Sequence, residues 1–260
     1  MKKAEFLPGL ASVSFRQHTP GEIIEAAANA KLDCIEWGGD IHVPPHDTEN
    51  AVKTARHTAD AGLAVSSYGS YYRIGITPLD EFRYVLETAS CLGAPIIRVW
   101  GYDRPLQAVE SVRLRELADE AKNIADLAKA AGIRVCMECH SGTLTEHFND
   151  ASLFVKMVNA DNFGMYWQPN QYNDHRYNLE SANALAPVVS CIHAFNWDAK
   201  NRYPLSSGTK VWKDYLSVFA SNGGKYPVLL EFMPDDMLTS LRGEANALKS
   251  MISDINDRNN

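Results

Sequence analysis

Glycines mark the predicted helix ends in this chain, and an apolar, strand-like run follows each of them. These marks are Ala61-Gly62, Leu92-Gly93, Ala131-Gly132 and Asn222-Gly223-Gly224. Glycine suits the left-handed position after a helix because it lacks a Cβ. Helix starts are marked by Thr19-Pro20-Gly21-Glu22 and Thr77-Pro78-Leu79-Asp80. In both, Thr suits the N-cap, Pro suits the first turn, and an acid follows the cap by three residues.

This punctuation predicts eight alternating strands and helices. Strands are predicted near residues 10–14, 33–37, 63–67, 95–100, 133–138, 163–168, 188–195 and 227–232. Helices are predicted between them, near residues 20–30, 48–61, 78–92, 109–131, 149–159, 178–186, 211–221 and 239–255. A repeat of about 30 residues that joins one strand to one helix is typical of βα units in a parallel sheet.

Eight such units in 260 residues are what a (β/α)8 TIM barrel requires. A doubly wound open sheet is the main alternative, and it would carry a glycine-rich phosphate loop after its first strand. Here the first strand leads into Ser14-Phe15-Arg16-Gln17-His18, which contains no glycine. No linker divides the chain, so we predict a single TIM-barrel domain, an α/β fold with a parallel eight-stranded barrel, over residues 1–260.

Composition and charge exclude several classes of protein. The chain is 45% hydrophobic and can bury a large core. Its formal net charge is −7 and it has no run of Lys or Arg, which argues against a nucleic-acid partner. No apolar run approaches the roughly 20 residues of a membrane helix. The start of the chain is apolar only briefly before Pro8-Gly9, so it makes a poor signal peptide.

The five cysteines lie within or beside apolar patterns, and an odd number of buried-looking thiols favours a reducing compartment. We therefore expect a soluble, cytoplasmic protein. Homo-oligomerisation is expected only from the base rate for soluble enzymes. Cys136 and Cys139 form a C-x-x-C match, but alternation along a strand places them on opposite faces, so we interpret the match as accidental.

Four predicted strands end on residues that can bind a divalent metal. These residues are Glu138, Gln168, His193 and Glu231. The carboxyl ends of the strands in a parallel barrel meet at one mouth, where active sites lie. Two residues before each of them stands an apolar or weakly polar residue, and alternation places it deeper in the barrel: Cys136, Tyr166, Cys191 and Leu229. Oxygen and imidazole ligands of this kind suit Mn²⁺, Mg²⁺, Co²⁺ or Zn²⁺.

A structural role is the alternative for each residue taken singly. Lys225 could pair with Glu231, and His193 could be a core histidine with satisfied hydrogen bonds. Four such residues at equivalent positions on successive strands favour a shared metal site.

Several segments resemble those of a known family. They are Cys136-Met137-Glu138-Cys139-His140, Cys191-Ile192-His193, Leu229-Leu230-Glu231-Phe232, Glu36-Trp37-Gly38-Gly39 and Ile97-Arg98-Val99-Trp100. They resemble the sugar phosphate isomerase/epimerase family of the xylose isomerase-like TIM barrel superfamily, which also includes endonuclease IV. The resemblance covers nearly the whole chain, and its short motifs indicate the superfamily better than the substrate.

The resemblance implies a metal site and a mechanism. The family's ligands, Glu, Asp, His and Glu, fall on Glu138, Gln168, His193 and Glu231, with one divalent ion, Mn²⁺ in preference to Mg²⁺, Co²⁺ or Zn²⁺. Glu138 and Glu231 are the implied catalytic pair, moving a proton through a metal-stabilised enediolate. Gln168 stands where most members have Asp. It can still coordinate but adds no charge, so we expect weaker metal binding and a more electrophilic cation, unless Gln168 contacts substrate instead.

The rest of the predicted mouth suits a polyol, because aromatic faces and polar side chains gather there. The candidate substrate contacts are Glu36, Trp37, His42, Arg98, Trp100, His140, Gln171 and Arg202. Arg98 and Glu36 are expected to face inward, where they could pair. The loops after the seventh and eighth strands lack a glycine cradle for phosphate. An unphosphorylated or acidic sugar is therefore the predicted substrate of a divalent-metal-dependent isomerase or epimerase.

Three alternatives stay open. A metal-dependent lyase or dehydratase acting on a sugar or sugar acid would use the same enolate chemistry. A carbohydrate-binding barrel without catalysis would be supported only by Gln168. DNA repair, by analogy with endonuclease IV, would need further ligands where this chain has Glu36, Tyr68 and Gln171, and a basic surface that its charge does not supply.

Overall fold

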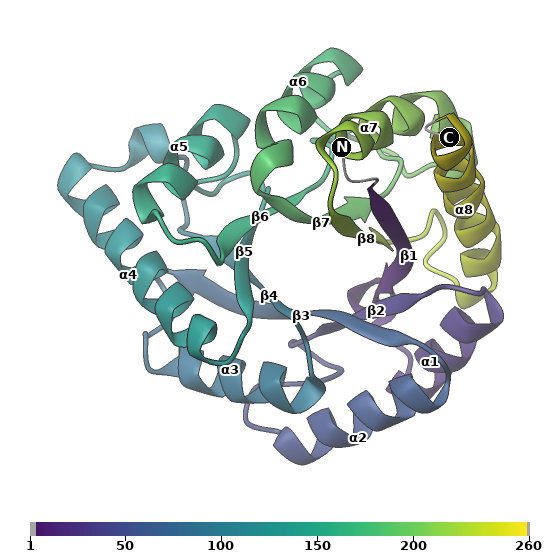
Figure 1. Cartoon of the computed structure of the whole chain (residues 1–260), viewed down its shortest axis with the longest axis horizontal. Helices are drawn as coiled ribbons and strands as arrows, with labels where there is room; N and C mark the ends of the chain where they lie inside the picture. Colours follow the sequence, from purple (N-terminus) through teal and green to yellow (C-terminus); the bar gives the residue numbers. More distant parts are fainter. Residues whose placement is uncertain (1–3, 259–260) are drawn as a thin grey trace.

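The computed structural model of the chain describes residues 4–258. Within that range eight parallel strands pair in sequence order and close into a barrel, with the helices outside it (Figure 1). The strands are β1 (Glu5–Ala11), β2 (Cys34–Gly38), β3 (Ala64–Ile74), β4 (Ile96–Gly101), β5 (Arg134–Glu138), β6 (Phe163–Trp167), β7 (Val189–Ala194) and β8 (Lys225–Leu230). The helices are α1 (Pro20–Asn29), α2 (Thr48–Asp60), α3 (Glu81–Leu92), α4 (Ser111–Ala130), α5 (Phe148–Val158), α6 (His175–Leu185), α7 (Thr209–Asn222) and α8 (Leu241–Arg258). The predicted (β/α)8 barrel is confirmed.

Most of the predicted helix punctuation is confirmed. Thr19 caps α1 through a capping box with Glu22. Gly62, Gly93 and Gly132 follow α2, α3 and α4 with φ of 77°, 67° and 71°. These are left-handed conformations, which cost glycine little because it has no Cβ.

The predicted start of α3 is wrong. The hydroxyl of Thr77 accepts the N–H of Arg73 at 2.9 Å and does not cap a helix. The chain then turns, and α3 begins at Glu81 after Asp80, whose side chain makes no capping bond. The preceding strand, β3, continues to Ile74 and does not end near Ser67 as predicted. The hydroxyl of Thr77 therefore stabilises the turn after a long strand.

The predicted first strand is also wrong in its bounds, because Pro8 and Gly9 are inside β1 and residues 12–15 form a 3-10 turn. Pro8 pairs in register with Val228, and β1 to β8 pairing closes the barrel. A Cβ on Gly9 would lie 2.6 Å from the carbonyl oxygen of Cys34 and 2.7 Å from the side chain of Leu229. Gly9 therefore permits a close approach inside the barrel that a larger residue would prevent.

The core has two layers separated by the strands. A small cluster fills the barrel interior: Ala11, Val13, Cys34, Ile96, Cys136, Tyr166, Cys191 and Leu229. The predicted layer of Cys136, Tyr166, Cys191 and Leu229 beneath the strand ends is part of it. A larger cluster lies between the barrel and the helices, where Trp167 of β6 packs against Trp212, Tyr215 and Phe219 of α7.

Cys136 belongs to the interior cluster, whereas Cys139 packs against the outer one. All five cysteines lie within the described chain and are free thiols there. The two cysteines of the C-x-x-C match therefore face apart, as predicted. None of the helices in residues 4–258 is both long and apolar enough to span a bilayer.

Candidate active site

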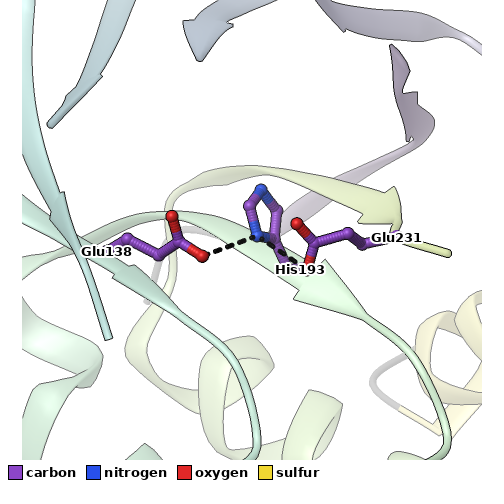
Figure 2. A group of neighbouring side chains, drawn as sticks. All are labelled: Glu138, His193 and Glu231. Carbon is purple, nitrogen blue, oxygen red and sulfur yellow. Dashed lines mark ion pairs between the residues drawn. The ribbon is translucent and has the colours of Figure 1, made fainter. Parts of the chain in front are cut away.

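Three strand ends bring Glu138, His193 and Glu231 together at the mouth of the barrel (Figure 2). Among residues 4–258 they are the one group of three acidic, histidine or cysteine side chains that could hold a metal, with their ligand atoms within 4.8 Å of one another. Their exposed fractions are 3%, 0% and 5%. Glu138 and Glu231 line a cavity of about 210 Å³ that opens at this end of the barrel. Strand polarity thus places the three residues where the sequence predicted.

The Nδ1 atom of His193 faces oxygen atoms from three other strands. Gln168 Oε1 lies 3.0 Å from it, Glu231 Oε2 lies 3.4 Å from it and Glu138 Oε1 lies 4.0 Å from it. An amide oxygen can only accept a hydrogen bond. Nδ1 of His193 therefore carries a proton, and its N–H donates a hydrogen bond to Gln168 Oε1. Three oxygens and one nitrogen around one proton are also a suitable donor set for a divalent cation in its place.

The acids around His193 change its proton affinity. Burial by itself would lower the pKa of the imidazole, but Glu231 and then Glu36 outweigh burial and raise the pKa to about 10. Burial would raise the pKa of Glu231, but His193 and Arg98 lower it below its usual value. These shifts favour a protonated His193 beside ionised Glu36 and Glu231 at neutral pH.

Arg98 of β4 supplies the permanent positive charge of the site. Its Nη1 lies 2.9 Å from Glu138 Oε2 and 3.9 Å from Glu36 Oε1. The indole N–H of Trp100 also donates to Glu138 Oε2, at 2.7 Å. One oxygen of Glu138 is therefore fixed by two donors, while Oε1 remains directed at His193. The predicted inward orientation of Arg98 and Glu36 is confirmed by this pairing.

The total charge supports a cation at this point. Glu36, Glu138 and Glu231 are opposed by Arg98 and protonated His193, which leaves a net charge of minus one. Replacing the His193 proton by a divalent ion makes the same set neutral. Lys225 does not neutralise Glu231, since it lies at the opposite end of β8 and pairs with Glu5 at 3.0 Å.

Four of the eight predicted substrate contacts line the cavity: Arg98, Trp100, His140 and Gln171. Arg202 lies beside the cavity, where its guanidinium is 4.9 Å from the ring of Trp197 and 5.0 Å from the ring of Phe232. Both of these rings line the cavity. Arg202 also pairs with Asp236 at 2.6 Å, which fixes it at the rim.

The structure does not bring the other three to the cavity wall. Trp37 is fully buried outside the barrel, where its indole N–H donates to Thr58 of α2 at 3.2 Å. His42 is buried in the loop after β2, with Nδ1 3.0 Å from the hydroxyl of Ser12. Glu36 lies inside the barrel against His193, out of the cavity lining.

Phe232, Tyr177 and Arg16 line the cavity although the sequence did not indicate them. Phe232 follows Glu231 directly, so strand alternation would place its ring on the outer face. Its φ of 54° is left-handed, and its N–H donates to the hydroxyl of Ser14 at 2.8 Å. This unusual backbone turns the ring to the cavity, and no pattern in the sequence signals such a turn.

His140 presents one free ring nitrogen at the cavity wall. Its Nδ1 lies 2.8 Å from the carbonyl oxygen of Ser141, and its ring stacks on Trp100 with centroids 4.6 Å apart. A carbonyl can only accept, so Nδ1 carries the proton and Nε2 has no hydrogen bond within the described chain. His140 is therefore equipped to accept a proton or a hydrogen bond at Nε2.

The family model for xylose isomerase-like TIM barrels matches residues 24–251. The chain belongs to this family. No curated protein sequence matches it. Among solved structures, a Mycobacterium smegmatis xylose isomerase-like TIM barrel protein in complex with magnesium is 17% identical with a TM-score of 0.76, covering 96% of this chain and 97% of that one.

Two further structures differ in their named activities. The probable 3-DHS dehydratase AsbF of Bacillus anthracis has a TM-score of 0.76 at 16% identity, covering 96% of this chain and 99% of its own. An L-ribulose 3-epimerase has a TM-score of 0.75 at 13% identity, covering 99% and 97%. At these identities the likeness establishes the shared fold, and the reaction has to be argued from the site.

Proposed function

We propose that this protein is a divalent-metal-dependent isomerase or epimerase acting on an unphosphorylated or acidic sugar. The observation that carries the proposal is the convergence of Glu138, His193 and Glu231 around one point of the cavity floor. Gln168 completes the set as a neutral oxygen donor, 3.0 Å from His193. We take Mn²⁺ as the ion, because carboxylate and amide oxygens suit it, with Mg²⁺, Co²⁺ and Zn²⁺ as alternatives.

Such an ion supplies Lewis-acid polarisation of a carbonyl and its neighbouring hydroxyl, which acidifies the hydrogen on the carbon between them. The protein's own groups then have to move that proton. Glu138 and Glu231 lie on opposite sides of the His193 ring (Figure 2). Two carboxylates that flank the reacting carbon can remove a proton from one face and return one to the other, as epimerisation requires.

The surroundings of the two glutamates give them different roles. Glu138 accepts from Trp100 and pairs with Arg98, and these donors stabilise its ionised form and fix its orientation. Glu231 faces His193 at 3.4 Å and has no comparable pair of donors within the described chain. With a cation in place of the His193 proton, Glu231 would have one hydrogen-bond donor fewer. We therefore assign the first proton abstraction to Glu231, and the return of a proton to Glu138 once that carboxylate has taken one up from water.

The aromatic wall around the two acids limits access of water. Trp100, Trp197 and Phe232 line the cavity, and Trp197 packs on Phe195 with ring centroids 4.3 Å apart. Apolar ring faces suit the C–H face of a sugar and strengthen electrostatic interactions by excluding water.

A dehydratase is the second candidate, and His140 is the observation that favours it. Elimination needs an acid to protonate the departing hydroxyl, in addition to the base that removes the proton. The free Nε2 of His140 at the cavity wall can accept the proton taken from carbon and then return it to the departing hydroxyl, whereas epimerisation by two glutamates does not require it.

One experiment separates these functions. The protein with Mn²⁺ is incubated in D₂O with aldoses, ketoses and sugar acids, and the products are analysed by mass spectrometry and NMR. Uptake of one deuterium next to the carbonyl supports the isomerase, and loss of water supports the dehydratase. Glu138→Gln and Glu231→Gln should abolish exchange, whereas Glu81→Gln on the surface of α3, where Glu81 lies near His46, should not.

Sugar binding without catalysis would contradict the proposed function. Sugar binding that survives chelation and Glu138→Gln, without deuterium uptake or loss of water, would contradict an enzyme. It would leave the carbohydrate-binding barrel as the better description.

A further inference from the structure

Glu36 is an acid at the centre of the barrel that neither lines the cavity nor belongs to the group of possible metal ligands. Only 1% of its surface is exposed. Its Oε2 accepts the hydroxyl of Ser67 at 2.9 Å. Its Oε1 lies 3.5 Å from His193 Nε2 and 3.9 Å from Arg98 Nη1. The carboxylate is therefore anchored on one oxygen and presents the other to the far side of the His193 ring.

The barrel makes room for this carboxylate and keeps it charged. A Cβ on Gly69 of β3 would lie 2.8 Å from Glu36 Oε1 and 3.3 Å from Arg98 Nη2, so a side chain there would displace one of them. Burial alone would raise the pKa of Glu36, but Arg98 and then His193 lower the pKa to about 2. A buried ion pair is seldom the most stable way to fill a core, which indicates that this one serves the site above it.

The two nitrogens of His193 face opposite partners. Nδ1 faces Gln168, Glu138 and Glu231, while Nε2 is buried and has no partner within 3.5 Å that meets hydrogen-bond geometry in the described chain. The Glu36 oxygen stands at the limit of that range, so a small rotation of the ring completes the bond. A histidine that binds metal through one nitrogen usually donates its other N–H to a carboxylate, which fixes the ring and its tautomer.

We infer that Glu36 is a positioning residue that holds the Nε2–H of His193 and so directs Nδ1, as the ligand nitrogen, at Glu138, Gln168 and Glu231. The inference rests on the proposed metal-dependent function. Loss of such a partner typically weakens metal binding about 10- to 100-fold.

The test compares Mn²⁺ affinities, measured from the EPR signal of free Mn²⁺, for the full-length protein and three variants. Glu36→Gln removes the charge, and Glu36→Asp keeps the charge but withdraws the carboxylate by one methylene. Glu146→Gln is the matched control, since Glu146 lines the cavity and bonds to the N–H of Gly142 rather than to His193. Thermal unfolding followed by circular dichroism establishes that each variant is folded.

Both Glu36 variants are expected to bind Mn²⁺ about 10-fold or more weakly, and Glu146→Gln is expected to match the wild type. The Zn²⁺-loaded wild type should also show a slowly exchanging imidazole Nε2–H signal in its NMR spectrum that is absent from His193→Asn and from Glu36→Asp. Wild-type affinity in Glu36→Asp, with this signal retained, would overturn the positioning role. A wild-type protein that binds no Mn²⁺ or Zn²⁺ would instead overturn the proposed function and this inference together.

Discussion

Metal binding should release one proton from His193, because the ring nitrogen that faces the three candidate ligand oxygens also carries a proton. The N–H at this nitrogen donates a hydrogen bond to Gln168 Oε1, with 3.0 Å between Nδ1 and the oxygen. The surrounding acids raise the pKa of His193 to about 10, so the ring is protonated at pH 7. At Glu36 and Glu231 the positive charges of Arg98 and His193 outweigh burial and lower the pKa values. Neither acid therefore has a proton to lose at this pH.

The free-energy cost of removing the His193 proton follows from the difference between pH 7 and a pKa of about 10. Each pH unit below the pKa costs a factor of ten, or about 1.4 kcal/mol, so removing the proton at pH 7 costs on the order of 4 kcal/mol. Mn²⁺ affinity should therefore rise about tenfold per pH unit between pH 7 and pH 9. Titration calorimetry at pH 7 in two buffers of different ionisation enthalpy should give about one proton per bound ion.

Mn²⁺ is the suitable ion because its aqueous form does not hydrolyse in this range. Glu146→Gln, which changes the charge of the cavity wall without touching His193, should release the same number of protons. An affinity that is flat between pH 7 and pH 9, with no proton released, would refute the reasoning. In that case His193 would be neutral before the ion arrives, or would not be a ligand.

The other predictions concern Gln168, the pairing of His193 and the buried Trp37. Gln168→Glu should bind Mn²⁺ at least about tenfold more tightly by EPR, because the added carboxylate attracts a doubly charged ion more strongly than the singly charged His193 that the ion would deprotonate. Unchanged affinity would show that residue 168 does not face the ion. In chelated protein, His193 contributes stability that is full below its ordinary pKa of 6.5 and is lost as pH rises through about 10. Urea unfolding should show a loss on the order of 4 kcal/mol between pH 7 and pH 10.5, and a constant free energy of unfolding would contradict the pairing. Trp37→Phe should lose about 1–3 kcal/mol of stability with its bond to Thr58, while sugar and metal affinities stay at wild-type values; a large rise in KM would place Trp37 at the substrate after all.

The convergence of the four candidate ligands could be predicted because it depends only on strand direction and on side-chain alternation. A parallel barrel brings the carboxyl ends of its strands to one mouth, and alternation decides which side chains face inward. Glu138 ends β5 and Gln168 follows β6 directly, so small errors in strand bounds did not move them. The predicted bounds of β1 were several residues off, but this did not affect the site, since no candidate ligand lies on that strand.

The outward orientation of Trp37, which contradicts its predicted role as a substrate contact, follows from alternation along β2. Glu36 and Trp37 are neighbours on β2, and neighbours on a strand face opposite sides. If Glu36 faces the barrel interior, Trp37 must face the helices, where it meets Thr58. Phe232 is different, because its left-handed backbone depends on a bond to Ser14 from a distant part of the chain. Such a tertiary contact leaves no local pattern to read.

Glu36 and Gln168 together define how strongly this site would polarise a substrate. Gln168 leaves the inner ligands with one negative charge fewer than an aspartate would give. Glu36 contributes a charge from behind His193, at 3.5 Å from the ring rather than at the cation. Arg98 offsets it while pairing with Glu138 at 2.9 Å. The total charge with a divalent ion would be zero, but the ion itself would keep more of its positive charge than among three carboxylates, because a charge behind the imidazole screens it less than a directly bound one.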